Sequence, residues 1–185
     1  MGVSNLSKMV CPKKTFSVRQ IAFLGLLLSL ALVLSYVEAL LTPLMALPPG
    51  VKIGLSNIAV MYALFLLNAP SAVVLVVLKS FFALLTRGPV SFWMSLSGGV
   101  LSVLAMLLLI RLKKAQISYL LISIFGGMFH NIGQVATASV LLGSGLALAY
   151  LPVLLISGVG MGAVTGLLYR AAAPYFKQIT FKTQK

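Results

Sequence analysis

Apolar residues occupy six long stretches of the chain, separated by short breaks that contain polar residues, proline or glycine. A helix needs about 20 apolar residues to cross the roughly 30 Å hydrocarbon core of a bilayer, and fewer within a bundle. The pattern predicts six transmembrane helices: Val18–Leu41, Ile53–Asn68, Ser71–Thr86, Ser91–Ile110, Ile117–Leu142 and Leu148–Ala172. We expect one all-α bundle over residues 18–172, with basic tails at residues 1–17 and 173–185.

The breaks contain residues that end helices or favour turns. They are Pro43 with Pro48, Pro49 and Gly50, then Asn68 to Pro70, Arg87 to Pro89, Arg111 to Gln116, and Gly143 to Gly145. A secretory signal peptide is the alternative for the first stretch, because a basic segment precedes it and Val37 and Ala39 resemble a cleavage site. The apolar run from Ile21 to Val37 is longer than the usual signal core, which favours a retained helix.

Composition strengthens the membrane interpretation. Hydrophobic residues make up 61% of the chain and charged residues 8%, and the mean hydropathy is +1.12, far outside the range of soluble domains. The net charge of +13 does not indicate nucleic acid, because the basic residues flank apolar runs instead of covering a polar surface. The single cysteine, Cys11, allows neither an intrachain disulfide nor a zinc site.

Lys and Arg are concentrated in cytoplasmic loops of membrane proteins, so their distribution predicts orientation. Three basic clusters lie before the first, after the fourth and after the sixth predicted helix: Lys8, Lys13, Lys14 and Arg19; Arg111, Lys113 and Lys114; Arg170, Lys177, Lys182 and Lys185. With six helices, all three clusters fall on one side. Both termini are therefore predicted to be cytoplasmic.

Glu38 is the only acidic residue, and the chain has no Asp. Sites that hold Mg²⁺ or divide acid and base roles usually need two or more carboxylates. We therefore expect no catalytic site and no metal site in this chain.

The few charged residues near the spans are candidates for a binding site, because a charge at the bilayer centre costs roughly 2.5–3.5 kcal/mol on insertion scales. Lys79 lies halfway along the third predicted helix, either lining a cavity or extending its stem to the headgroups or to carbonyls at a helix end. Glu38 and Lys52 flank the proline-rich turn and either pair with each other or, with Arg87, rim a pocket that opens outward. Such a pocket favours an anionic or electron-rich ligand.

The fifth predicted helix carries the densest polar stretch within any span. His130 and Gln134 share a helix face, Asn131 is adjacent, and nearby glycines permit close approach of a backbone or ligand. These side chains either bind a ligand or hydrogen-bond to neighbouring helices. Small residues are also spaced for close helix contacts, either within this chain or with a partner: Gly158, Gly162 and Gly166; Ala31, Ser35 and Ala39.

Three motifs occur in order: residues 47–58 (LPPGVKIGLSNI), residues 95–99 (SLSGG), and Gly127-x-x-His130-Asn131-x-Gly133-Gln134. Together they resemble the bacterial membrane family called Gx transporter, often labelled heptaprenyl diphosphate synthase component I. The resemblance covers about residues 18–172. It implies a multi-pass protein of the bacterial cell membrane.

That family is similar in layout to the substrate-binding S-components of energy-coupling-factor transporters. The similarity implies an outward-opening pocket, and a surface with Ala31, Ser35 and Ala39 that meets a transporter partner. Long-chain prenyl diphosphate synthases hold Mg²⁺-diphosphate with Asp-rich motifs, which this chain lacks. Some family members are associated with electron transfer from quinols to extracellular flavins, which would bring flavin or quinone as cofactor; we predict none from the residues themselves.

The leading hypothesis is a transport-type protein that works with partner subunits and binds a small hydrophobic or anionic molecule among its helices. The first alternative is a non-catalytic subunit of a heptaprenyl diphosphate synthase. The second is a membrane component of quinol-to-flavin electron transfer. The residues expected to bind the ligand are Glu38, Lys52, Asn57, Lys79, Arg87, His130, Asn131 and Gln134.

Overall fold

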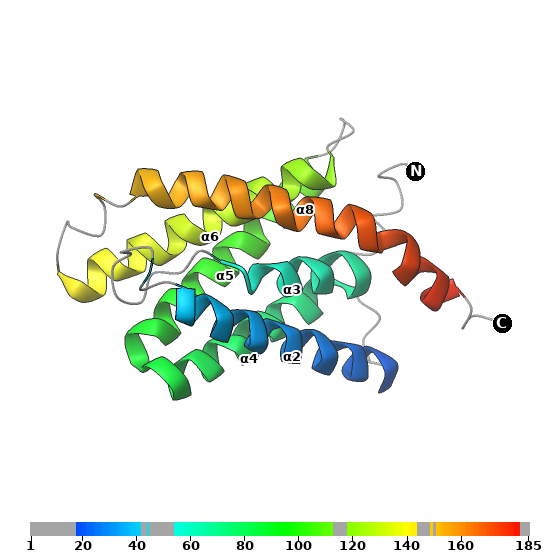
Figure 1. Ribbon diagram of the computed structural model, residues 1–185, viewed down its shortest axis with the longest axis horizontal. Helices are drawn as coiled ribbons and strands as arrows, with labels where there is room; N and C mark the ends of the chain where they lie inside the picture. Colours follow the sequence, from blue (N-terminus) through cyan, green and yellow to red (C-terminus); the bar gives the residue numbers. More distant parts are fainter. Residues whose placement is uncertain are drawn as a thin grey trace.

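The computed structural model describes residues 18–41, 44, 54–112, 118–143, 149 and 151–181, and each regular element in this part of the chain is helical (Figure 1). The elements are α2 (Val18–Leu41), α3 (Asn57–Tyr62), the π-helix η2 (Ala63–Leu67), α4 (Ala69–Arg87), α5 (Pro89–Arg111), α6 (Tyr119–Leu142) and α8 (Leu151–Phe181). Because η2 follows α3 directly, these seven elements form six helical rods.

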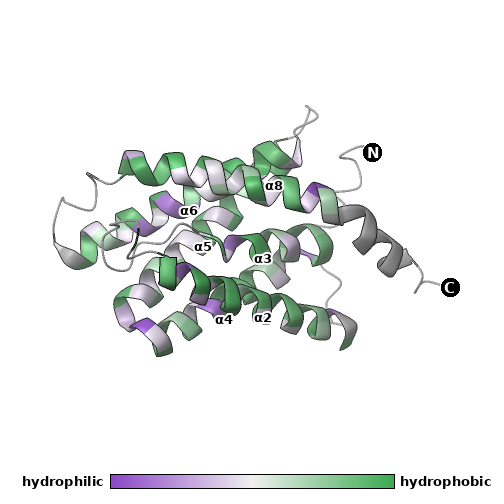
Figure 2. Ribbon diagram, viewed as in Figure 1, coloured by the Kyte–Doolittle hydropathy of each residue, from purple (hydrophilic) through white to green (hydrophobic). Residues whose placement is uncertain are grey.

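Five of the described rods are long and apolar enough to cross a bilayer, and most of the ribbon is coloured hydrophobic (Figure 2). They are Gln20–Leu41, Ala69–Arg87, Pro89–Arg111, Tyr119–Leu141 and Leu151–Ala171. Large apolar side chains remain exposed along them, as in Leu26, Val33 and Leu85, which suits a surface that faces lipid. The protein is therefore a multi-pass membrane protein, as its hydropathy predicts.

The second predicted span is the exception. The structure has an 11-residue rod there, Asn57–Leu67, which is about 16 Å long and spans about half of the hydrocarbon core. The turn before it needs a glycine, because Gly54 has φ 97°, and the extended residue Asn68 ends it. Hydropathy did not reveal this short length, since apolar residues continue up to Ile53.

The two breaks that flank α4 are described, and they fall where asparagine, proline and glycine predict them. The Asn68 side chain accepts a hydrogen bond from the Ser71 N–H at 2.9 Å and caps α4, and Gly88 separates α4 from α5 with φ 87°. At the far end of the chain α8 continues to Phe181, nine residues beyond the predicted end. Hydropathy sets the end of a membrane span, whereas a helix can continue past it with polar residues such as Lys177.

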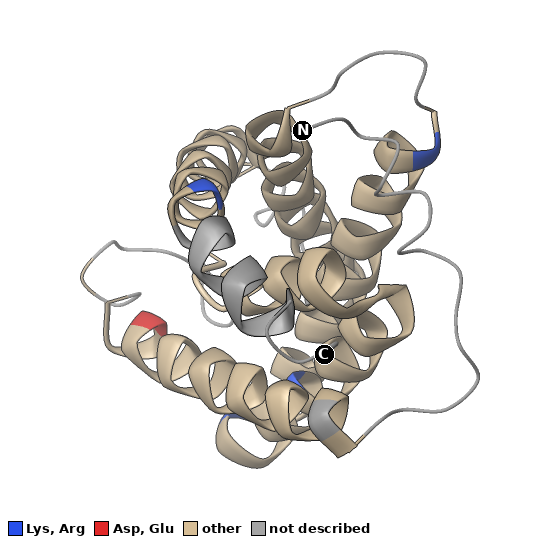
Figure 3. Cartoon of the chain, turned by 90° about the vertical axis from the view of Figure 1, so that its right-hand side faces the viewer, with Lys and Arg blue, Asp and Glu red and all other residues tan. Residues whose placement is uncertain are grey.

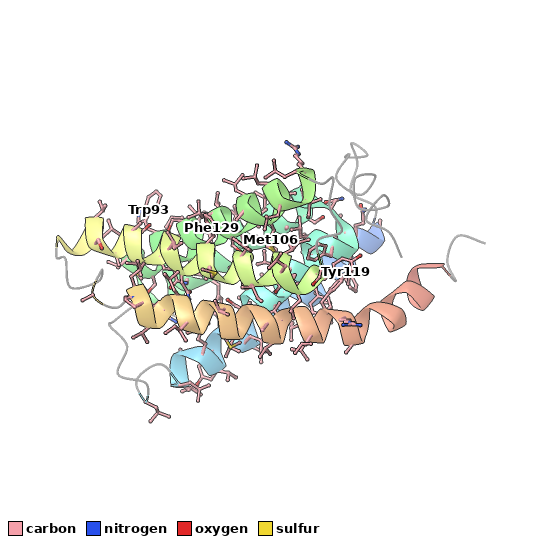
Figure 4. The ribbon with its side chains drawn as sticks, turned by 90° about the horizontal axis from the view of Figure 1, so that it is seen from above. Trp93, Met106, Tyr119 and Phe129 are labelled. Carbon is pink, nitrogen blue, oxygen red and sulfur yellow. The ribbon has the colours of Figure 1, made fainter. Side chains whose placement is uncertain are left out.

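Successive rods run in alternating directions, so the start of α2 and the end of α8 lie at the same end of the bundle (Figure 1). This arrangement fits an even number of passes. Which end faces the cytoplasm stays a prediction from the Lys and Arg distribution. In the side-chain view Trp93 and Tyr119 lie toward opposite ends of the molecule (Figure 4), and aromatic residues at both ends are typical of proteins that span a bilayer.

Glycines form the seam between α6 and α8. A Cβ added to Gly162 would lie 2.5 Å from the Ile124 Cα, and one added to Gly166 would lie 2.8 Å from the Leu120 Cα. The repeated GxxxG spacing on α8 therefore packs against α6 of the same chain. Close backbone approach of this kind is how helices gain packing energy in lipid, where no hydrophobic effect drives them together.

The small residues of α2 also face inward. Ala31 is 0% exposed and Ser35 is 8% exposed, and α2 contacts α3, η2 and α4. The expectation that these residues form a surface for a transporter partner is therefore wrong for Ala31 and Ser35. Their spacing indicates close packing, and α3 and α4 supply that packing within the chain.

Candidate functional site

Buried polar side chains from four long helices meet around the start of α3. Gly54 lies beside His130, the twelfth of 24 residues of α6, and Ser56 contacts Lys79, the eleventh of 19 residues of α4. The short rod therefore begins near the middle of the bundle. We call the following residues the central polar cluster: Glu38, Gly54, Ser56, Asn57, Lys79, Arg87, Ser102, His130 and Gln134.

Glu38 ties the end of α2 to the turn that starts α3. Its side chain is 0% exposed, and its Oε1 accepts a hydrogen bond from the backbone N–H of Gly54. A carboxylate before the first turn of a helix is also favourable for the helix dipole. Figure 3 shows this single acidic position near the end of its helix.

Lys79 points into the bundle. It is 3% exposed, and its Nζ donates to the Ser56 Oγ at 3.4 Å, so the interpretation that its stem extends to the headgroups is wrong. The Glu38 carboxylate attracts this ammonium electrostatically. A hydroxyl at that distance is a weak partner for a buried charge.

Arg87 is half-buried at the end of α4, and its Nη2 donates to the backbone carbonyl of Ser35 on α2. Glu38 attracts this guanidinium as well. Two cations from α4 therefore share one carboxylate from α2. This leaves the described part of the cluster with one excess positive charge.

His130 and Gln134 contribute to the cluster from α6. Their Nε2 atoms lie 2.6 Å apart, and both residues are buried. Glycines make this possible, since a Cβ on Gly98 would lie 3.0 Å from the His130 Nδ1 and one on Gly54 would lie 3.4 Å from its Cδ2. Asn57 connects the turn to α5, because its Nδ2 donates to the Ser102 Oγ at 3.1 Å.

Six of the predicted site residues thus belong to one cluster: Glu38, Asn57, Lys79, Arg87, His130 and Gln134. Asn131 belongs elsewhere: its Nδ2 donates to the Leu154 carbonyl at 2.5 Å and to the Ser157 Oγ at 3.3 Å, both on α8. For Asn131 the structure supports hydrogen bonding between helices. Lys52 and the proline-rich turn lie outside the described residues, so the Glu38–Lys52 pair and the outward-opening pocket stay predictions.

Sequence reasoning missed Gly54, Ser56 and Ser102 as members of the cluster. Gly54 and Ser56 stand in the GLSN segment, where a glycine two residues before a serine indicates a turn. That segment was assigned to a continuous span, and its polar side chains were not expected to begin a helix inside the bundle. Nothing in the sequence singles out Ser102 from the other serines of its helix.

Residues 27–172 match the family model described as heptaprenyl diphosphate synthase component I. The match includes every residue of the central polar cluster. No curated protein and no solved structure matches the chain.

Proposed function

The chain belongs to the heptaprenyl diphosphate synthase component I family, and on that premise we propose that it is a non-catalytic membrane subunit that binds an anionic prenyl ligand beside a separate catalytic chain. Catalysis is assigned to the partner because chain elongation needs several carboxylates to hold Mg²⁺-diphosphate. This chain has one carboxylate side chain, Glu38, and one of its oxygens already accepts a hydrogen bond from the Gly54 N–H.

The observation that carries the proposal is the charge balance of the central polar cluster. Lys79 and Arg87 face one carboxylate, and the described hydrogen-bond partner of Lys79 is the neutral Ser56. An incompletely neutralised charge is costly inside a bilayer and marks a functional site by default. A ligand phosphate would offset the excess charge with charge-assisted hydrogen bonds, while a prenyl tail suits the surrounding lipid.

Binding of a short prenyl diphosphate tests the ligand assignment. Farnesyl diphosphate and farnesol differ only in the anionic group, and their affinities can be compared by native mass spectrometry. A charge-assisted hydrogen bond contributes about 1.5–3 kcal/mol, or roughly 10–100-fold in affinity. We expect Lys79→Met to weaken farnesyl diphosphate by about that factor and to leave farnesol unchanged.

Arg111→Met is the matched control, because Arg111 is an exposed cation at the end of α5. It should alter neither affinity. Equal binding of the diphosphate to wild type and Lys79→Met, in samples that remain folded, would remove the anion site from the proposal.

The subunit role needs its own experiment. Affinity-tagged protein should co-purify from its native membrane with a catalytic chain that contains Asp-rich motifs, and chain-elongating activity should fall when this chain is removed. A fully active synthase without this chain would contradict the subunit role, whatever the binding assay shows.

A transport-type, ligand-binding component is the second candidate, and the half-length rod favours it. Transporters place binding sites near the bilayer midplane where interrupted helices begin, and α3 begins beside Lys79 and His130. The chain has no phosphate-binding loop of the ATPase type, so energy would come from a partner or a gradient. Co-purification with an ATPase pair instead of a synthase would support this candidate.

A further inference from the structure

A small, partly enclosed cavity lies between α3, α6 and α8, and neither Lys79 nor Arg87 lines it. It is lined by Gly54, Asn57, Ser123, Gly127, His130, Met161, Gly162 and Thr165. Its volume, counted as the space open to the centre of a water molecule, is about 10 Å³, which is at the lower limit of the roughly 10–15 Å³ that one buried water needs. The cavity is therefore the size of a single water molecule.

Asn57 presents an unsatisfied acceptor there. The residue is 7% exposed, and its Nδ2 donates a hydrogen bond to the Ser102 Oγ at 3.1 Å. Its Oδ1 is buried and has no hydrogen-bond partner among the described residues. An amide oxygen can only accept, so the missing partner must be a donor.

The other polar groups that line the cavity limit which kind of molecule it can bind. Thr165 donates its proton to the Met161 carbonyl at 2.7 Å, so its oxygen offers only lone pairs to the cavity. The Ser123 hydroxyl can donate or accept, and the His130 Nε2 is engaged with Gln134 at 2.6 Å. A molecule that donates two hydrogen bonds and accepts one can satisfy these three groups. An anion would instead lie against two hydrogen-bond acceptors.

We propose that this cavity is a binding site for one water molecule, which donates to the Asn57 Oδ1 and the Thr165 Oγ1 and accepts from the Ser123 hydroxyl. Each of the three groups belongs to a different helix, so the water joins the start of α3 to the seam between α6 and α8. Water-mediated contacts are nearly as favourable as direct hydrogen bonds. The water therefore helps to hold the central polar cluster against the glycine seam.

Two serines of α6 provide a matched comparison. Ser123 lines the cavity, whereas Ser139 does not line it, and the Ser139 hydroxyl is buried without a hydrogen-bond partner in the described part of the chain. Ser123→Ala removes a bond to the water and should lower the midpoint of thermal unfolding by about 2–4 °C for a chain of this size. Ser139→Ala removes a hydroxyl that makes no hydrogen bond to the described residues and should leave the midpoint unchanged or raise it.

A crystal structure with ordered solvent gives the direct test. One peak should lie about 2.7–3.2 Å from the Asn57, Ser123 and Thr165 oxygens and should weaken or vanish in the Ser123→Ala variant. An empty cavity, or equal midpoints for the two alanine variants, would overturn the proposal. The midpoint should also stay constant when Na⁺ and K⁺ are replaced by N-methylglucamine; a selective loss would identify a metal cation instead of water.

Discussion

Replacing Glu38 by Gln removes the one negative charge in the described part of the central polar cluster while keeping nearly the same shape. The new amide oxygen can still accept a hydrogen bond from the Gly54 N–H, so the turn before α3 keeps its hydrogen-bond partner. Lys79 and Arg87 lose the carboxylate that attracts them. The variant therefore separates the electrostatic role of Glu38 from its role in holding the turn.

The expected magnitude follows from burial. Glu38 is 0% exposed and Lys79 is 3% exposed, so solvent screens their attraction little. Removing one partner of a buried charge pair costs about 3–5 kcal/mol, and arginine at the cluster edge is more easily solvated. We expect the free energy of unfolding to fall by about 3 kcal/mol, which corresponds to roughly 6–12 °C in the unfolding midpoint for a chain of this size.

The assay is thermal unfolding in detergent, monitored as the fraction of the protein that remains monodisperse after heating. Glu38→Gln is compared with Lys79→Met and with the double variant, which completes a double-mutant cycle. If the two charges stabilise each other, the double variant should be more stable than the sum of the single losses predicts. Additive losses, or a Glu38→Gln midpoint equal to that of wild type, would refute the electrostatic reasoning and leave Glu38 with the Gly54 contact alone.

Three further outcomes can be measured in the same way. Gly54→Ala should lower the free energy of unfolding by about 1–2 kcal/mol, because φ 97° strains any residue with a Cβ; an unchanged midpoint would mean that the turn relaxes. Gly162→Ala should destabilise the protein through the 2.5 Å approach to the Ile124 backbone, whereas Gly160→Ala, which has open space at its Cβ, should not; equal effects would show that the seam is not closely packed. Asn131→Leu should lower stability but leave farnesyl diphosphate affinity unchanged, because its Nδ2 bonds to α8; selective loss of binding would return Asn131 to the ligand site.

Hydropathy predicted the long helices well because a bilayer imposes one length requirement on every spanning helix. α2 begins and ends at the predicted residues, and α4, α5 and α6 agree to within two residues. The short rod could not be recognised in this way. A half-length helix that is buried from Asn57 to Phe65 needs no polar face, so its residues are as apolar as those of a complete span.

The sequence indicated several of the residues in the candidate site, but it did not show how they are arranged or which residues they contact. Lys79 was identified because a charge within a span must have a partner, but the sequence does not show that this partner is Ser56, 23 residues away. His130, Asn131 and Gln134 are close together in sequence, yet a helix turns about 100° per residue. His130 and Gln134 consequently face the cluster, while Asn131 faces α8.

The electrostatic attraction between Glu38 and the cations of α4 also has a consequence for biosynthesis. Lys79 is made 41 residues after Glu38, which at about 5–20 residues per second is a delay of roughly 2–8 s. For that interval the carboxyl group of Glu38 exists without the cations of α4. The helix that carries it, α2, is the most hydrophobic of the five long spans that the structure describes, which offsets part of the cost of placing an acidic group in the bilayer before α4 has packed beside it.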